Sequence, residues 1–141
     1  MKILFVCSGN SGRSPMAEFV MKKLVADAGL SGKISVSSAA SKPTNGEHMH
    51  QGIAAKLGIE NIPFSEHIAR TITKGDYAAN DCIICMDAGN VAQVKAIVGG
   101  DPDNKISMLL DKDIPWDKNG FATTYDDILR GCKALLEKIA Q

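Results

Sequence analysis

Short apolar runs alternate with longer amphipathic stretches along this chain. The apolar runs have the length of β-strands and lie at residues 2–7, 33–39, 81–86 and 105–110. Apolar residues recur with a helical period at residues 15–28, 47–57, 88–98 and 121–140, and a short helix is expected at 73–79. Strands that alternate with helices predict an α/β fold of three layers, in which a four-stranded parallel sheet carries helices on both faces.

Composition narrows the class of protein. The 141 residues, 45% of them hydrophobic, are typical of one globular domain, which we expect to span residues 1–141. Sixteen basic and sixteen acidic residues give zero formal net charge, which argues against a nucleic-acid or membrane-surface partner. No apolar run has the length of a membrane span, and the polar segment 8–14 interrupts the N-terminal run before a signal-peptide core is complete. We expect a cytoplasmic protein.

The segment between the first strand and the first helix carries the candidate chemistry. It begins at Cys7, contains Gly9 and Gly12, and ends at Arg13. Strand-loop-helix units direct several backbone N–H groups at one point, and glycine takes up the conformations that such a loop needs. The Arg13 guanidinium adds donors that match a tetrahedral oxyanion. We therefore predict an N-terminal phosphate-binding loop, with the Cys7 thiol beneath the anion in surroundings that favour the thiolate.

Each of these residues alone has a simpler explanation. A cysteine at the end of an apolar strand is usually a small core residue, and two glycines usually form a turn. Ser14 followed by Pro15 is typical of a helix start, with Ser14 as the N-cap. The combined spacing Cys-x5-Arg-Ser between a strand and a helix is hard to explain by packing, and it favours an anion-binding loop with a nucleophile.

The loop resembles the phosphate-binding loop of protein tyrosine phosphatases. Its N-terminal position and the following Pro15-x-Ala17-Glu18 resemble the low-molecular-weight class. Further similar motifs are Ser38-Ala39-Ala40, His67-x-Ala69-Arg70, Asp81-x-Ile83-x-x-Met86-Asp87-x-x-Asn90, Pro115-Trp116 and Phe121-x3-Tyr125-x2-Ile128. The resemblance implies hydrolysis of phosphotyrosine-type monoesters, with a phosphotyrosine protein or a small aryl phosphate as substrate. It implies neither a metal nor a cofactor, and a monomer is the default oligomeric state.

The resemblance also assigns roles. Cys7 is the expected nucleophile and forms a thiophosphoryl intermediate, while Arg13 and the loop amides hold the phosphoryl oxygens. Ser14 is expected to donate its hydroxyl to the Cys7 sulfur, and His67 to be a neutral structural residue. The substrate-binding residues are then Ser8, Gly9, Asn10, Ser11, Gly12, Ser14 and Trp116. Asn10 and Ser38 are expected to stabilise the loop.

Two positions depart from the family pattern. A general acid is needed to protonate the leaving group, and the family has an aspartate directly before the Pro-Trp pair, where this chain has Ile114. We expect Asp113 to be the acid after a local shift of its loop, with Asp117 as the alternative. Trp116 would then wall the pocket and stack on an aryl group. Gly12 stands where many members have a second cysteine, so a disulfide with Cys7 inside the loop is not available.

The remaining cysteines bear on the alternative functions. Cys82 and Cys85 lie three apart in a predicted strand, so they face opposite sides and are expected to be structural. A thioredoxin-coupled arsenate reductase shares the loop and fold but needs two further cysteines on a mobile segment. A cysteine-loop phosphoryl carrier would lack the arginine. A phosphatase-like protein that binds phosphate with weak turnover also stays open.

Overall fold

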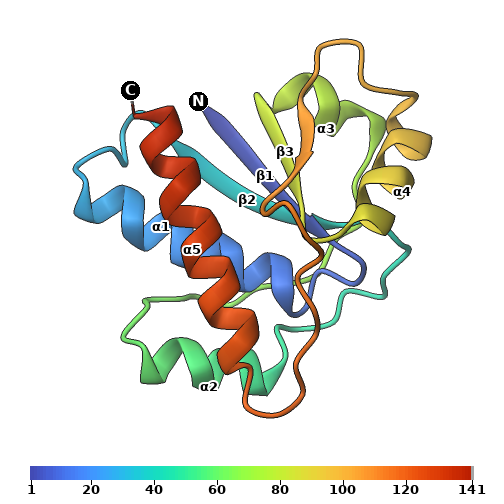
Figure 1. The fold of residues 1–141 in the computed structure, drawn as a ribbon. Coiled ribbons are helices and arrows are strands. Elements are labelled where there is room, and N and C mark those ends of the chain that lie inside the picture. The colour runs from blue at the N-terminus through green and yellow to red at the C-terminus, as the bar shows by residue number, and fades with distance from the viewer. Residues whose placement is uncertain (141) are drawn as a thin grey trace.

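The computed structural model describes residues 1–140 and forms one parallel sheet with helices on both faces (Figure 1). The strand order is β2-β1-β3-β4, and each neighbouring pair is parallel. The predicted α/β fold is therefore confirmed, while residue 141 of the expected domain lies outside the described residues. In chain order the elements are β1 (Lys2–Cys7), α1 (Arg13–Asp27), β2 (Ser35–Ala40), α2 (Gln51–Ile59), α3 (Lys74–Ala79), β3 (Cys82–Cys85), α4 (Ala88–Val98), β4 (Ile106–Met108) and α5 (Ala122–Ile139).

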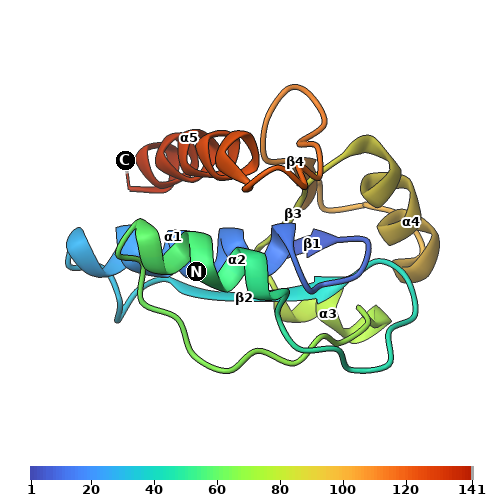
Figure 2. The same cartoon turned by 90° about the horizontal axis from the view of Figure 1, so that it is seen from below.

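The central strand β1 explains the two-sided core. Ile3, Phe5 and Cys7 belong to one buried cluster, together with side chains of α1, α2 and α5. Leu4 and Val6 belong to a second cluster, together with side chains of α3 and α4. Figure 2 shows α1 and α5 close together on one side of the sheet. A strand buried on both faces is apolar at nearly every position, as the run after Met1 is.

Some predicted boundaries are wrong for identifiable reasons. Helix α2 begins at Gln51 rather than at residue 47, because His50 is its N-cap and accepts a hydrogen bond from the Gly52 amide. His48 lies outside the helix, in an isolated bridge with Ile68. The helix also continues through Gly58, the predicted stop, to Ile59. Strand β4 is shorter than predicted.

The start of α1 differs from the prediction as well. The helix begins at Arg13 with Gly12 as its N-cap residue, so Ser14 is not the N-cap that the simpler explanation of this residue would make it. Ser14 lies in the first turn and is fully buried, and its hydroxyl contacts Cys7 and Asn10 instead. The Ser14 hydroxyl, which could have capped the helix, therefore forms hydrogen bonds within the loop instead.

The strand ends place the distant parts of the site together. The carboxyl ends of parallel strands meet at one edge of the sheet, where ligands of such folds bind. Segments 8–12, 86–87 and 109–121 all leave the sheet at this edge. Within residues 1–140, no helix combines the length and apolar character needed to span a bilayer. The same residues contain no cluster of three or more His, Cys, Asp or Glu arranged to hold a metal ion.

Candidate active site

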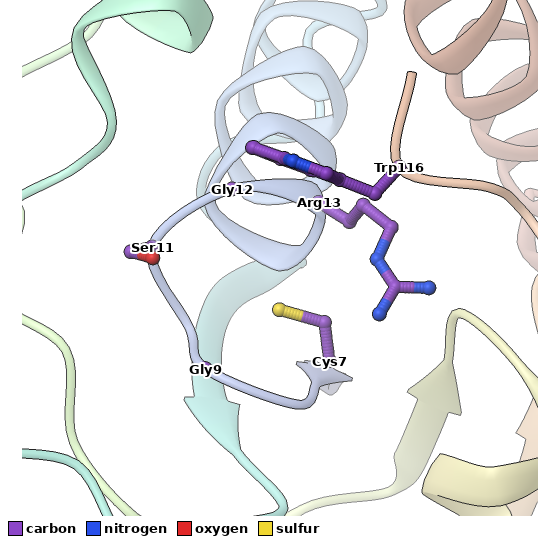
Figure 3. A pocket seen from close by; sticks show the side chains of 6 residues that line it. All are labelled: Cys7, Gly9, Ser11, Gly12, Arg13 and Trp116. Carbon is purple, nitrogen blue, oxygen red and sulfur yellow. The ribbon is translucent and has the colours of Figure 1, made fainter. Parts of the chain in front are cut away.

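A small pocket lies directly beyond the end of β1. Its cavity has a volume of about 160 Å³ and is lined by Cys7, Gly9, Ser11, Gly12, Arg13 and Trp116. Figure 3 shows the Cys7 thiol within the curl of the loop, the Arg13 guanidinium beside it, and the Trp116 ring above Gly12. The structure thus brings together the N-terminal loop and Trp116, which lie about a hundred residues apart in the sequence.

The Cys7 sulfur receives hydrogen bonds from within the loop. Its Sγ lies 3.0 Å from Ser14 Oγ and 3.2 Å from the Asn10 amide nitrogen. The Asn10 side-chain NH₂ donates to Ser14 Oγ at 2.9 Å, so the hydroxyl proton of Ser14 is left to point at the sulfur. Two donors directed at one sulfur stabilise negative charge on it. Only 3% of Cys7 is exposed, on the side that opens into the pocket.

Asn10 holds the loop in its curled form. It is fully buried and has a positive φ of 56°, which asparagine tolerates better than most residues. Its side-chain oxygen accepts from the Arg70 amide at 3.1 Å, and its backbone carbonyl accepts from His67 Nε2 at 2.8 Å. The expected structural role of His67 fits this contact. The loop is therefore fixed before any substrate arrives, as electrostatic catalysis requires.

A buried carboxylate lies behind the loop. Asn10 Nδ2 donates to Ser38 Oγ at 2.9 Å, and Ser38 Oγ donates to Glu18 Oε1 at 2.6 Å. Glu18 is 8% exposed, and its other oxygen accepts from Lys22 Nζ at 2.6 Å. Because Glu18 can only accept here, it orients the Ser38 hydroxyl and through it the Asn10 amide. Two chains of hydrogen bonds therefore start at the Asn10 side-chain NH₂. One passes through the Ser38 hydroxyl to Glu18, and the other passes through the Ser14 hydroxyl to the Cys7 sulfur.

Arg13 is anchored by one nitrogen only. Its Nη1 donates to Asp87 Oδ2 at 2.8 Å and to the Ile114 carbonyl at 2.9 Å. Its Nη2 and Nε have no protein hydrogen-bond partner among residues 1–140. The side chain is 13% exposed, and Figure 3 shows the guanidinium beside the Cys7 side chain. The arginine is therefore held in position while several of its donors remain free for an oxyanion.

Asp87 is a site residue whose role could not be inferred from the sequence pattern. One carboxylate oxygen pairs with Arg13, and the other accepts from the Asn90 amide at 2.8 Å as the N-cap of α4. Partial burial raises the pKa of Asp87, but the hydrogen bonds from Arg13 and the Asn90 amide outweigh it and leave the pKa below its usual value. An ionised Asp87 keeps Arg13 in place and is a poor proton donor. Its position two residues after the end of β3 was the available signal, because β3 ends beside β1.

Ser8 supports the loop from outside the pocket. Its hydroxyl lies 3.1 Å from the side-chain amide of Asn90, and its carbonyl accepts from the Lys42 amide at 3.2 Å. The Ser41 amide donates to the Cys7 carbonyl at 2.8 Å. Ser8, Asn10 and Ser14, which we expected to bind substrate, are therefore not among the side chains that line the cavity.

The candidate acids lie outside the pocket. Asp113 is exposed, and its Oδ1 accepts from the Ala88 amide at 2.9 Å at the start of α4. Asp117 Oδ1 accepts from the Asn119 amide at 2.9 Å within its own loop. Ile114 is fully buried, and its backbone N–H donates to the Met86 carbonyl at 2.9 Å. The structure does not bring Asp113 to the cavity.

The two strand cysteines face opposite sides of the sheet, as predicted. Cys82 packs against the cluster that contains Cys7, and Cys85 belongs to the cluster on the other face. All four cysteines of the chain are free. Burial, reinforced by the charge of Asp87, raises the pKa of Cys85 to about 12. Such a thiol is inert near neutral pH.

The fold and loop define a class of α/β protein built around an N-terminal anion site. The sequence matches the family described as low molecular weight phosphotyrosine protein phosphatase over residues 2–141. It is 36% identical to the human low molecular weight phosphotyrosine protein phosphatase, over 96% of this chain and 94% of that protein. The structure is similar to the crystal structure of YfkJ from Bacillus subtilis, with a TM-score of 0.91 and 35% sequence identity over 99% of this chain and 94% of that chain. It is also similar to the crystal structure of SP-PTP from Streptococcus pyogenes, with a TM-score of 0.87 and 34% identity over 98% of this chain and 92% of that chain.

The chain belongs to the low molecular weight phosphotyrosine protein phosphatase family. It is therefore an enzyme of the protein-tyrosine-phosphatase class, as the resemblance implied. A cysteine-dependent mechanism is typical of this family, and its substrates are phosphotyrosine proteins or small phosphate esters.

Proposed function

We propose that this pocket hydrolyses phosphate monoesters with Cys7 as nucleophile and Arg13 as the cation that binds the phosphoryl oxygens. The observation that supports this proposal most strongly is the position of the Cys7 sulfur, at the base of a cavity that the loop and Arg13 enclose (Figure 3). The thiolate attacks phosphorus, so that an S–P bond forms while the P–O bond to the leaving group breaks. Water then attacks phosphorus, releases inorganic phosphate and restores the thiolate.

The surrounding donors match the charges of both steps. Negative charge on the equatorial oxygens meets the loop N–H groups and the free donors of Arg13. In the second step the sulfur leaves as an anion, and the Ser14 hydroxyl and the Asn10 amide lie 3.0 and 3.2 Å from it. Preformed donors of this kind need no reorganisation during the reaction.

Trp116 favours an aromatic leaving group. Its indole ring lines the cavity, where it offers an apolar surface to a phosphorylated ring. We propose a phosphotyrosine protein or a small aryl phosphate as substrate, and a monomeric protein in the cytoplasm, where a nucleophilic thiol stays reduced. Phosphate release should be faster from a phosphotyrosine peptide than from the matching phosphoserine peptide. Equal release from both would contradict the aryl assignment.

We propose Asp113 as the general acid, reached by a movement of its side chain. Its carboxylate accepts a hydrogen bond from the backbone amide of Ala88. Ala88 is the residue after Asp87, and Asp87 contacts Arg13. The backbone of Ile114 is held on both sides, by Met86 and by Arg13, so the movement has to come from Asp113 itself. Asp117 would have to leave its hydrogen bond within the loop and pass Trp116.

Replacement of Asp113 by asparagine tests this assignment. We expect the phosphorylation of Cys7 by phenyl phosphate to slow on the order of 10²-fold, because a poor leaving group depends on protonation. Phosphorylation by p-nitrophenyl phosphate should slow by only about threefold, since that leaving group departs as an anion. Burst rates for both substrates provide the measurement.

Asp117→Asn is the matched control for the acid, since it removes a carboxylate from the same loop. It should change neither burst rate by more than about twofold. An equal, modest effect of Asp113→Asn on both substrates would remove Asp113 from the mechanism. A strong leaving-group dependence in Asp117→Asn would move the role to that residue.

An arsenate reductase would need a second reactive thiol besides Cys7. A relay would need Cys82 or Cys85 to attack an oxidised Cys7, but Cys85 is fully buried and its pKa is about 12. Burial and the charge of Asp81 also raise the pKa of Cys82. The structure therefore favours the phosphatase, and thioredoxin-coupled arsenate reduction should be undetectable.

Thiol labelling checks this reading. With iodoacetamide at neutral pH, Cys7 should be alkylated fastest in the folded protein, and inorganic phosphate should protect it by occupying the pocket. Cys85 should react only after unfolding, since burial keeps it protonated. Rapid labelling of Cys85 in the folded protein, or a disulfide between Cys7 and Cys85 after peroxide treatment, would revive the reductase.

A further inference from the structure

The Trp116 ring packs directly against the backbone of Gly12. A Cβ atom at position 12 would lie 2.1 Å from Trp116 Cζ3 and 2.6 Å from Cη2. Real carbon contacts lie near 3.5–4.0 Å, so any side chain at this position would displace the ring. Figure 3 shows the ring directly above Gly12 at the mouth of the pocket. Glycine at this position is therefore what allows the tryptophan to reach the phosphate-binding loop.

Other side chains hold the ring in that place. Phe121 packs on it with ring centroids 4.8 Å apart, and the His50 ring meets it edge-on at 5.4 Å. Phe121 depends on a second glycine in the same way, because a Cβ at Gly52 would lie 2.3 Å from its Cε2. The indole is thus fixed from behind by an aromatic cluster and from below by Gly12.

We propose that Gly12 is a specificity-determining residue, which places Trp116 as a flat wall of the pocket and so selects phosphate esters of planar, ring-containing leaving groups. This inference rests on the proposed function, since the wall contacts the leaving group of that reaction. A ring stacked on an indole face gains a preference of about two- to tenfold over a group without a ring. Gly12 acts through Trp116 and touches no reacting atom in this role, so it is a positioning residue.

The kinetic test is a double-mutant cycle with Gly12→Ala, Trp116→Ala and the double variant. Two substrates are compared by kcat/KM: p-nitrophenyl phosphate, which has a ring, and acetyl phosphate, which has none. Both have good leaving groups, so the general acid does not bias the comparison. The ratio of the two kcat/KM values should fall about two- to tenfold in each single variant. In the double variant it should match Trp116→Ala alone, because the side chain that clashes is gone.

A second readout does not depend on activity. Trp116 is the only tryptophan in the chain, so intrinsic fluorescence reports on this ring alone. In Gly12→Ala the emission should move to longer wavelength and acrylamide quenching should rise, because the ring leaves its packed position. Gly58→Ala is the matched control, since a Cβ there would meet no atom within 4 Å. It should leave both the fluorescence and the substrate ratio unchanged.

The outcomes separate the two claims. Unchanged fluorescence and an unchanged substrate ratio in Gly12→Ala would overturn the role of Gly12. Losses in the double variant that equal the product of the two single losses would also overturn it, because they would indicate damage to the loop itself. If the wild-type protein hydrolysed neither substrate, the proposed function would fail and this specificity with it. Hydrolysis of both substrates with an unaltered ratio in the variants would refute the specificity alone.

Discussion

Replacement of Cys7 by serine should abolish hydrolysis of aryl phosphates while leaving anion binding in place. A serine hydroxyl is a far weaker nucleophile than a thiolate, and no base lies beside position 7 to activate it, because Ser14 and Asn10 both donate toward the sulfur. We expect kcat for p-nitrophenyl phosphate to fall on the order of 10³-fold or more. The loop amides and Arg13 remain, so binding of inorganic phosphate, measured by calorimetry, should stay within about threefold of wild type.

Cys82→Ser is the control for this variant. Cys82 is a partly exposed thiol of β3 outside the pocket, so its loss should leave kcat within about twofold. Turnover near the wild-type rate in Cys7→Ser would end the assignment of the nucleophile. Loss of both turnover and phosphate binding would instead show that the loop had lost its form.

Arg13→Lys should be the next most damaging change. Lysine keeps the positive charge but loses the planar fork, and with it the combination of an anchored Nη1 and free donors at Nη2 and Nε. We expect a loss of about 2–4 kcal/mol of transition-state stabilisation, by analogy with the removal of an oxyanion donor. That loss is a fall of roughly 30- to 1,000-fold in kcat/KM for p-nitrophenyl phosphate.

The matched control is Arg70→Lys. The Arg70 guanidinium pairs with Asp76 on the surface, and only its backbone amide supports the loop, through Asn10. This variant should retain kcat/KM within about threefold of wild type. A similarly small effect of Arg13→Lys would show that Arg13 supplies charge alone and that its directed donors have no part in catalysis.

Local sequence was enough to predict the loop. Cys7 and Arg13 lie in one short segment between a strand and a helix, so their spacing alone indicated that they share an anion site. The alternating β and α patterns likewise predicted the parallel sheet, because each period follows from local geometry. Neither inference needed to know which residues meet across the fold.

What the sequence did not predict comes from competing contacts, one inside the loop and one between distant segments. Ser14 has the features of an N-cap, but Asn10 and Cys7 use its hydroxyl, and the sequence does not show which partner prevails. Asp87 directly precedes the helix predicted over 88–98, and its contact with Arg13 can be predicted only when the sheet order is known. Asp87 does both at once, as the N-cap of α4 and as the partner of Arg13, whereas Ser14 makes only the loop contacts.

The wall of the pocket could not be predicted in detail for the same reason. Trp116 was expected near the site, but its packing against Gly12 depends on the path of segment 109–121 across the sheet edge. Asp113 was expected there too, and the same path instead directs its carboxylate to the Ala88 amide. A shift of one residue along an irregular loop changes which side chain faces the pocket, and no periodic pattern records that choice.

Trapping of the phosphorylated enzyme tests the central claim most directly. The protein is mixed with p-nitrophenyl phosphate, quenched during the first turnover and digested, and the peptides are mapped by mass spectrometry. We predict one phosphoryl group on the sulfur of Cys7, which forms at least as fast as steady-state turnover and disappears as inorganic phosphate is released. Cys7→Ala should trap none. An active enzyme with no adduct at Cys7, or with the phosphoryl group on another residue, would contradict the account.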